Sequence, residues 1–297
     1  MNDSNFKSGI VAIVGRPNVG KSTLVNQIVG EKVSIVTRKP QTTRNRIAGI
    51  LNDQRGQIVF LDTPGFHESD RIINKRLSET ALRALKECDL IIWVVDGSCL
   101  PKEDEIALAG FLQNVRSLVM IAINKSDMFA KNHRGIISEP YQALLPGKNT
   151  YAISALSGDG VETIINQAFA TLPMGEALYP EDEYTDQTER FLVSEIIREK
   201  LFNALHDEIP HSLAVLVNEM KTRDNQTLYI AADILIERES QKPIVIGKKG
   251  DNLKKIGQEA RAELEDIFST KVFLELWVKV RPKWREKDLF LRQLGII

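Results

Sequence analysis

Two glycines, a lysine and a serine stand close together near the start of the chain, in an order that suits the binding of phosphate. They follow the apolar segment 10–14 and precede the amphipathic segment 24–29, so they join a predicted strand to a predicted helix. Glycines let backbone N–H groups approach a polyphosphate, the lysine supplies a cation, and the serine hydroxyl can ligate Mg²⁺. The phosphate-binding candidates are Gly15, Arg16, Pro17, Asn18, Val19, Gly20, Lys21, Ser22 and Thr23.

A second set of polar residues follows the predicted strand 58–61 and consists of Asp62, Thr63, Pro64 and Gly65. An aspartate at the end of a strand can hold a Mg²⁺-bound water, and a glycine N–H can reach a terminal phosphate that exists only before hydrolysis. The segment after Gly65 is therefore expected to respond to the nucleotide state. On its own, the tetrapeptide would be a simple turn.

A third set follows the predicted strand 118–123, at the edge where open α/β sheets bind ligands. Asp127 can accept hydrogen bonds from the ring N–H and the amino group of guanine, whereas adenine would leave the carboxylate unpaired. Alone, these residues are also typical of a helix cap. With the two phosphate motifs before them they predict a guanine site, whose candidates are Asn124, Lys125 over the purine, Asp127, Ser154, Ala155 and Leu156.

The elements that must position these residues are readable from the hydrophobic pattern. Apolar runs alternate with amphipathic ones through the first half, which predicts a P-loop α/β domain with a mostly parallel, six-stranded sheet and helices on both faces. The expected strands are 10–14, 58–61, 90–95, 118–123 and 151–153, with 46–51 as an antiparallel edge strand.

The periodicity stops near residue 172, and the acidic, proline-containing stretch 179–186 follows. It resembles a linker, so we expect one domain over 1–175, a linker over 176–189 and a second domain over 190–297. The second domain is expected to be α+β. Its predicted elements are helices 190–208 and 252–267 and strands 213–219, 227–237 and 271–280.

The composition limits the class of protein. The 297 residues are 43% hydrophobic, enough for two cores, and no apolar run approaches the length of a membrane-spanning helix. The two cysteines favour a reducing compartment, and the four histidines have no metal-ligand spacing. Although the net charge is −1, residues 242–292 carry 13 Lys and Arg against 8 Asp and Glu. Such a basic region suits contact with phosphates, but it also fits an ordinary solvated face.

A glycine-flanked lysine pair lies in this basic region, between the apolar residues 244–246 and the predicted helix 252–267. Two glycines at this spacing are weak evidence alone, but such a loop can clamp the backbone of single-stranded RNA beside an apolar groove. The RNA-binding candidates are Gly247, Lys248, Lys249, Gly250 and Lys254. In the segment 279–287, Trp284 is equally suited to stacking on RNA and to packing at the edge of the domain.

Together these motifs resemble the Ras-like GTPase superfamily and, more narrowly, the bacterial Era GTPases, over essentially the whole chain. The resemblance implies a GTPase domain followed by a type II KH domain. It also places Gln41, Thr42, Thr43 and Arg44 in the first switch, with Thr43 favoured over Thr42 as a Mg²⁺ ligand. The implied metal ligands are Ser22, Thr43 and, through water, Asp62.

The chain departs from the Ras pattern at Phe66, where a Ras-type protein has a water-orienting glutamine, so intrinsic hydrolysis is expected to be slow. In related GTPases an asparagine at the position of Asn18 helps to hold K⁺, and we expect K⁺ stimulation here. The terminal phosphate is expected to order residues 38–45 and 65–75.

The implied function is a GTP-to-GDP switch in the cytoplasm, mainly monomeric, that binds 16S rRNA and assists maturation of the 30S ribosomal subunit near the 3′ end of that RNA. One alternative is a nucleotide-gated, RNA-binding assembly placeholder, in which hydrolysis only sets the time of release. Another is a GTPase regulator of growth and division, peripheral on the cytoplasmic face of the inner membrane. The sequence has no amphipathic anchor or lipidation motif that would favour this last alternative.

Overall fold

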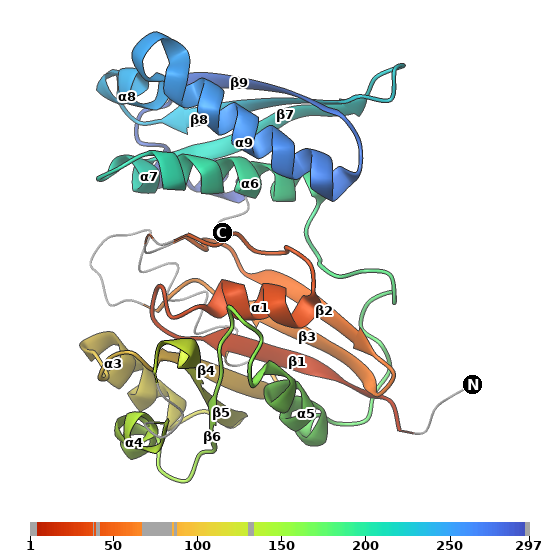
Figure 1. Cartoon of the computed structure of the whole chain (residues 1–297), viewed down its shortest axis with the longest axis vertical. Coiled ribbons are helices and arrows are strands. Elements are labelled where there is room, and N and C mark those ends of the chain that lie inside the picture. Colours follow the sequence, from red (N-terminus) through yellow and green to blue (C-terminus); the bar gives the residue numbers. More distant parts are fainter. Residues whose placement is uncertain are drawn as a thin grey trace. The chain divides into compact units, whose positions relative to one another are not determined.

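The computed structural model describes residues 5–37, 39, 42–66, 85, 88–129 and 134–294. The chain divides into two compact units, which are described separately (Figure 1). One unit comprises residues 1–36 and 40–186, and the other comprises 37–39 and 187–297.

The first unit is built on a six-stranded sheet with the strand order β2-β3-β1-β4-β5-β6. All neighbouring strands are parallel except β2, which is antiparallel to β3. Every residue of β3 and β4 is buried, as expected for strands covered on both faces. The strands are β1 (Lys7–Val14), β2 (Ile47–Asp53), β3 (Gly56–Asp62), β4 (Leu90–Asp96), β5 (Leu118–Asn124) and β6 (Thr150–Ala152).

Helices cover both faces of this sheet. On one face, Trp93 of β4 packs in a core with Leu108 and Tyr141, which lie on α3 and α4. On the other face, a side-chain carbon added at Gly49 of β2 would collide with Val25 of α1. The predicted doubly covered α/β sheet is therefore confirmed. The helices of this unit are α1 (Lys21–Val29), α3 (Glu103–Leu112), α4 (Arg134–Leu144) and α5 (Val161–Thr171), with a 3₁₀ turn, η1, at Ser126–Met128.

Residues 178–186, which we call the strap, differ from the predicted linker because they belong to the first unit. Thr185 forms an antiparallel bridge with Gly49, and the N–H of Ile50 donates to the carbonyl of Tyr184 (2.9 Å). The side chain of Gln57 accepts hydrogen bonds from the N–H groups of residues 178 and 179 (2.7 and 2.9 Å). The strap thus adds backbone pairing to the outer edge of the sheet.

The second unit is an α+β layer pair, as predicted. Its sheet has the order β7-β8-β9, with β7 and β8 antiparallel and β8 and β9 parallel. Alternate residues of β8, such as Ile230 and Ile234, point into a core shared with helices α6 and α9, which lie side by side (Figure 1). The strands are β7 (Ala214–Thr222), β8 (Leu228–Ile236) and β9 (Val272–Val280), and the helices are α6 (Glu189–Ala204), α7 (Ile209–Ser212), α8 (Lys242–Ile246), α9 (Asp251–Phe268) and α10 (Asp288–Gln293).

Short 3₁₀ turns complete this unit at η3 (Glu239–Gln241), η4 (Lys248–Gly250) and η5 (Trp284–Glu286). Across the described residues of both units, the helices are all too short or too polar to cross a lipid bilayer.

Candidate functional site

The loop between β1 and α1 requires glycine at both ends. Gly15 has φ 155° and Gly20 has φ 100°, in the region of backbone space that favours glycine. A side-chain carbon would lie 2.2 Å from the carbonyl oxygen of Val94 at the first position and 2.2 Å from the amide nitrogen of Asn124 at the second. The predicted phosphate loop therefore fits between β4 and β5 because it has no side chain at either end.

Lys21, the first residue of α1, is held inside this loop. Its Nζ donates to the carbonyls of Gly15 and Arg16, each at 3.0 Å. Burial lowers the pKa of Lys21 to about 8, although the nearby carboxylate of Asp62 opposes the shift. The loop thus presents a buried cation whose pKa lies below that of an ordinary lysine.

Three oxygen-bearing side chains meet beside Lys21. The hydroxyls of Ser22 and Thr43 are 2.9 Å apart, so the structure brings Thr43 rather than Thr42 to Ser22. Both carboxylate oxygens of Asp62 are buried, and neither has a hydrogen-bond partner within the described part of the chain. Burial raises the pKa of Asp62 above its usual range, while the nearby Ser22 hydroxyl and Lys21 lower it. An orphaned carboxylate beside two hydroxyls fits the oxygen ligands that Mg²⁺ requires.

The segment after Asp62 packs onto the phosphate loop. The hydroxyl of Thr63 donates to the carbonyl of Ile13 (2.8 Å), and the N–H of Phe66 donates to the carbonyl of Gly15 (3.1 Å). A side-chain carbon at Gly65 would lie 2.8 Å from the backbone nitrogen of Pro17, so only glycine allows this approach. The rest of the segment expected to respond to the nucleotide, 67–75, lies outside the described residues, as do positions 38, 40 and 41 with Gln41.

The side chain of Phe66 belongs to the hydrophobic core of the first unit. It is buried and packs edge-on against Phe111, with 5.8 Å between the ring centroids. The side chain at this position therefore lies among apolar groups.

Asn124 ties the predicted guanine-binding segments to the phosphate loop. Its Nδ2 donates to the carbonyl of Val19 (2.7 Å), and its Oδ1 accepts from the N–H of Ala155 (2.8 Å). Asp127 and Leu156 are exposed, whereas Ser154 is fully buried. The structure thus brings the phosphate loop and both segments of the predicted guanine site together at the carboxyl ends of β1, β5 and β6.

Two acidic residues at this site were missed by the sequence analysis. Asp96, the last residue of β4, accepts hydrogen bonds from Lys125 (2.6 Å) and Arg16 (3.3 Å), and Glu105 on α3 also pairs with Arg16 (3.1 Å). Asp96, like Asp62, is the last residue of a buried strand. This position in the sequence could have identified Asp96 as a candidate site residue. Glu105 carried no such signal, because it lies within a helix.

The glycine-flanked loop of the second unit forms the start of α9. Gly247, Lys249 and Gly250 all have positive φ (78°, 53° and 86°). The side chain of Asn252 closes the loop by donating to the carbonyl of Ile244 (3.0 Å). A side-chain carbon at Gly247 would lie 2.8 Å from the Cβ atom of Asn252. Both lysines of the pair are exposed.

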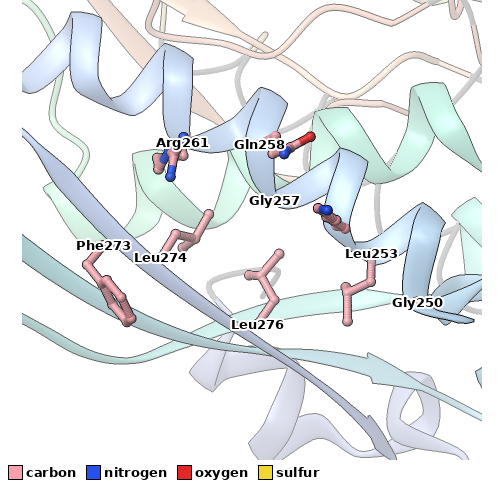
Figure 2. A pocket seen from close by; sticks show the side chains of 9 residues that line it. Gly250, Leu253, Gly257, Gln258, Arg261, Phe273, Leu274 and Leu276 are labelled. Carbon is pink, nitrogen blue, oxygen red and sulfur yellow. The ribbon is translucent and has the colours of Figure 1, made fainter.

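A groove of about 420 Å³ lies beside this loop, between α9 and β9 (Figure 2). Its apolar lining includes Leu253 and Leu276, and α9 contributes the polar side chains of Lys254, Gln258 and Arg261. Gly257, in the middle of α9, removes a side chain from the wall, so the helix leaves room above Leu276. An apolar groove with a polar edge suits the bases of a single nucleic-acid strand.

Trp284 does not take part in this surface. It is fully buried, and its Nε1 donates to the carbonyl of Ser212 (3.0 Å), so the hypothesis that it stacks on RNA is wrong and the packing alternative is confirmed. Two of the basic residues near it are paired within the unit: Lys279 with Asp233 (2.7 Å) and Arg285 with Glu237 (2.5 Å). The cationic character of this segment is therefore partly neutralised.

Comparison with known proteins places both units in described families. The family described as 50S ribosome-binding GTPase matches residues 10–125, and the KH domain family matches residues 208–285. The chain is 47% identical to GTPase Era of Geotalea uraniireducens (strain Rf4), over 99% of each chain. It is 44% identical to GTPase Era of Carboxydothermus hydrogenoformans, over 98% of each.

Two solved Era structures have the same fold over 98% of this chain and 99% of theirs. A substituted Era of Aquifex aeolicus bound to GDP and AlF₄⁻ is 40% identical, with a TM-score of 0.93. An Era in complex with MgGDPNP and nucleotides 1506–1542 of 16S ribosomal RNA is 42% identical, with a TM-score of 0.92. The predicted GTPase and KH units are confirmed, and the chain belongs to the Era family of GTPases.

Proposed function

We propose that this chain is a GTP-hydrolysing switch that binds 16S rRNA through its KH unit and assists maturation of the small ribosomal subunit. The observation that carries the proposal is the hydrogen-bonded link through Asn124, which joins a phosphate loop to a base-binding segment in one site. The glycine-flanked loop and its groove supply the second binding surface. A related Era bound to MgGDPNP and a 16S rRNA fragment supports both halves of the proposal.

In this proposal, the backbone of residues 15–20 cradles the phosphates, and Lys21 stabilises negative charge on the outer phosphate. Ser22, Thr43 and Asp62 would hold Mg²⁺, with Asp62 acting through a water. A bound Mg²⁺ would neutralise charge on the phosphoryl oxygens. Because Phe66 is buried, no side chain at that position orients the attacking water, and we expect slow intrinsic hydrolysis.

Asp127 is the proposed base-selecting residue, and its test is nucleotide binding measured by calorimetry. Asp127→Asn is expected to raise the Kd for GTP about a hundredfold, because the amide cannot accept two hydrogen bonds from guanine. Weak ATP binding should be the same in both proteins. The proposal fails if the unaltered chain binds ATP as tightly as GTP, or binds neither.

A further part of the proposal concerns a K⁺ ion at the phosphate loop. Asn18 lies exposed in the phosphate loop with φ 64°, and we propose that it helps to hold K⁺ near the phosphates. GTP turnover is then expected to be about tenfold faster in K⁺ than in matched Na⁺ buffer, because the ion adds positive charge where negative charge develops. In Asn18→Gly, which tolerates the same φ, the difference should vanish. Equal rates for the unaltered chain in both buffers would exclude this role.

We further propose that the protein acts in the cytoplasm, where both of its proposed ligands are found, and that it is mainly monomeric. Acceleration of multiple-turnover hydrolysis by small ribosomal subunits would support the switch. Single-round release without acceleration would favour the placeholder alternative. Co-sedimentation with anionic vesicles would instead support the peripheral membrane alternative.

A further inference from the structure

Asp96 lies between the phosphate loop and the base-binding segment, at the carboxyl end of β4. Its Oδ2 accepts from Nζ of Lys125 (2.6 Å) and from Nη2 of Arg16 (3.3 Å). Its Oδ1 accepts from the N–H and the hydroxyl of Ser98 (3.0 and 2.6 Å). The side chain is only 8% exposed, so solvent weakens these interactions little.

Arg16 is anchored on its other side as well. Its Nε donates to Glu105 (3.1 Å), whose side chain is completely buried. The second carboxylate oxygen of Glu105 accepts from the N–H of Lys102 (2.8 Å) at the start of α3. The guanidinium is therefore held by two acids that are fixed to two different elements, and the backbone of Arg16 is part of the phosphate loop.

Lys125 is the other partner of Asp96. Its backbone has φ 66°, a left-handed conformation that is costly for a lysine and that the surrounding contacts must maintain. Burial alone would raise the pKa of Asp96, but hydrogen bonds from Lys125 and Ser98 hold the pKa below its usual range. The carboxylate is therefore charged at neutral pH and pairs with Lys125 there.

We propose that Asp96 is a positioning residue of the nucleotide site, which holds the stem of Lys125 in place against the base and links it to Arg16 in the phosphate loop. One carboxylate oxygen then fixes the spacing between the base-binding and phosphate-binding parts of the site. This inference rests on the proposed guanine site. Asp96 itself acts through Lys125 and Arg16.

The test is a double-mutant cycle on the dissociation rate of fluorescent N-methylanthraniloyl-GDP. Asp96→Asn keeps the shape of the side chain but removes its charge, and Lys125→Met removes the partner. Each is expected to raise the dissociation rate about tenfold, less than for a fully buried ion pair, because the side chain of Lys125 is 31% exposed. Because Asp96 acts in part through Lys125, the dissociation rate of the double variant should rise by clearly less than the product of the two single effects. Multiplied effects, or an unchanged rate in Asp96→Asn, would overturn the inference.

Two further variants separate positioning from a general loss of structure. Ser98→Ala removes a hydrogen bond to Oδ1 and leaves the shared oxygen intact, so its dissociation rate should stay within about twofold of the unaltered rate. Lys125→Arg keeps a cation that can pair with Asp96, so its dissociation rate should lie well below that of Lys125→Met. If Asp96→Asn does not fold, the comparison of Lys125→Arg with Lys125→Met still tests the inference. A rate in Lys125→Arg as high as in Lys125→Met would overturn the inference.

The same assay distinguishes this inference from the function on which it rests. If the unaltered chain does not bind labelled GDP, the proposed guanine site itself fails. If it binds and the cycle is additive, only the role of Asp96 fails.

Discussion

Replacing Lys21 with methionine is expected to lower kcat for GTP hydrolysis about a thousandfold, the effect of removing a preorganised charge from the transferred phosphoryl group. Methionine nearly preserves the volume of the lysine stem, so α1 should remain in place. The measurement is single-turnover hydrolysis at saturating GTP. A kcat within tenfold of the unaltered value would contradict the role given to Lys21.

The same residue predicts a pH dependence. Burial lowers the pKa of Lys21 to about 8 in the nucleotide-free protein, so binding above that pH must take up a proton. The Kd for GTP should therefore rise with pH above about 8, by up to about tenfold per unit, and Lys21→Met should not show this rise. Calorimetry between pH 7 and 9.5 would measure both.

Raising the pH above 8 is expected to weaken GTP binding but to increase the stability of the fold. The folded-state pKa lies below the ordinary value of 10.5, so the nucleotide-free protein gains stability as pH rises from about 8 to 10.5. It loses that stability as pH falls from 10.5 to about 8, and below 8 this group adds no further change. At neutral pH the buried ammonium costs about 3 kcal/mol, and Lys21→Met should raise the melting temperature of the nucleotide-free protein. A lower melting temperature would indicate that the variant is misfolded.

Reversing the charge of the lysine pair, Lys248→Glu with Lys249→Glu, is expected to weaken RNA binding about a thousandfold at low salt, while the Kd for GTP is unchanged. Both side chains are exposed in a loop whose shape is set by glycine, so the backbone should tolerate the change. The measurement is retention of a labelled RNA from the 3′ end of 16S rRNA.

A matched control has the same change in net charge at two positions outside the loop and the groove. Lys255→Glu with Lys271→Glu alters two exposed lysines that do not line the described groove. This variant should bind RNA within about tenfold of the unaltered chain, through the loss of long-range attraction alone. Equal losses in the two variants would mean that net charge, and not the loop, retains the RNA.

The sheet of the first unit could be predicted because its strands are buried on both faces and therefore appear as continuous apolar runs. The strap could not, because its pairing with β2 uses backbone N–H and carbonyl groups that leave no side-chain pattern. An acidic stretch with a proline was interpreted as a linker for that reason. Trp284 was ambiguous because a buried indole and a stacked indole have the same local sequence.

The phosphate and base motifs could be found because the residues that define each lie in a short run of sequence, such as 15–22 and 124–127. The network around Asp96 could not be found in this way, because Arg16, Asp96 and Lys125 are separated by 80 and 29 positions. Such pairings depend on which strands become neighbours. The sequence predicted that β1, β4 and β5 exist, but the pairing of individual side chains at their ends came only with the structure.

The strap also has a protective consequence for the first unit. β2 is the edge strand of the sheet. The unpaired backbone N–H and carbonyl groups of an edge strand can form hydrogen bonds with a strand of another chain. The bridge from Thr185 to Gly49 and the hydrogen bond from Ile50 occupy that position. A fragment ending at residue 175 would uncover this strand and be prone to self-association. A fragment that extends through residue 186 would keep it shielded.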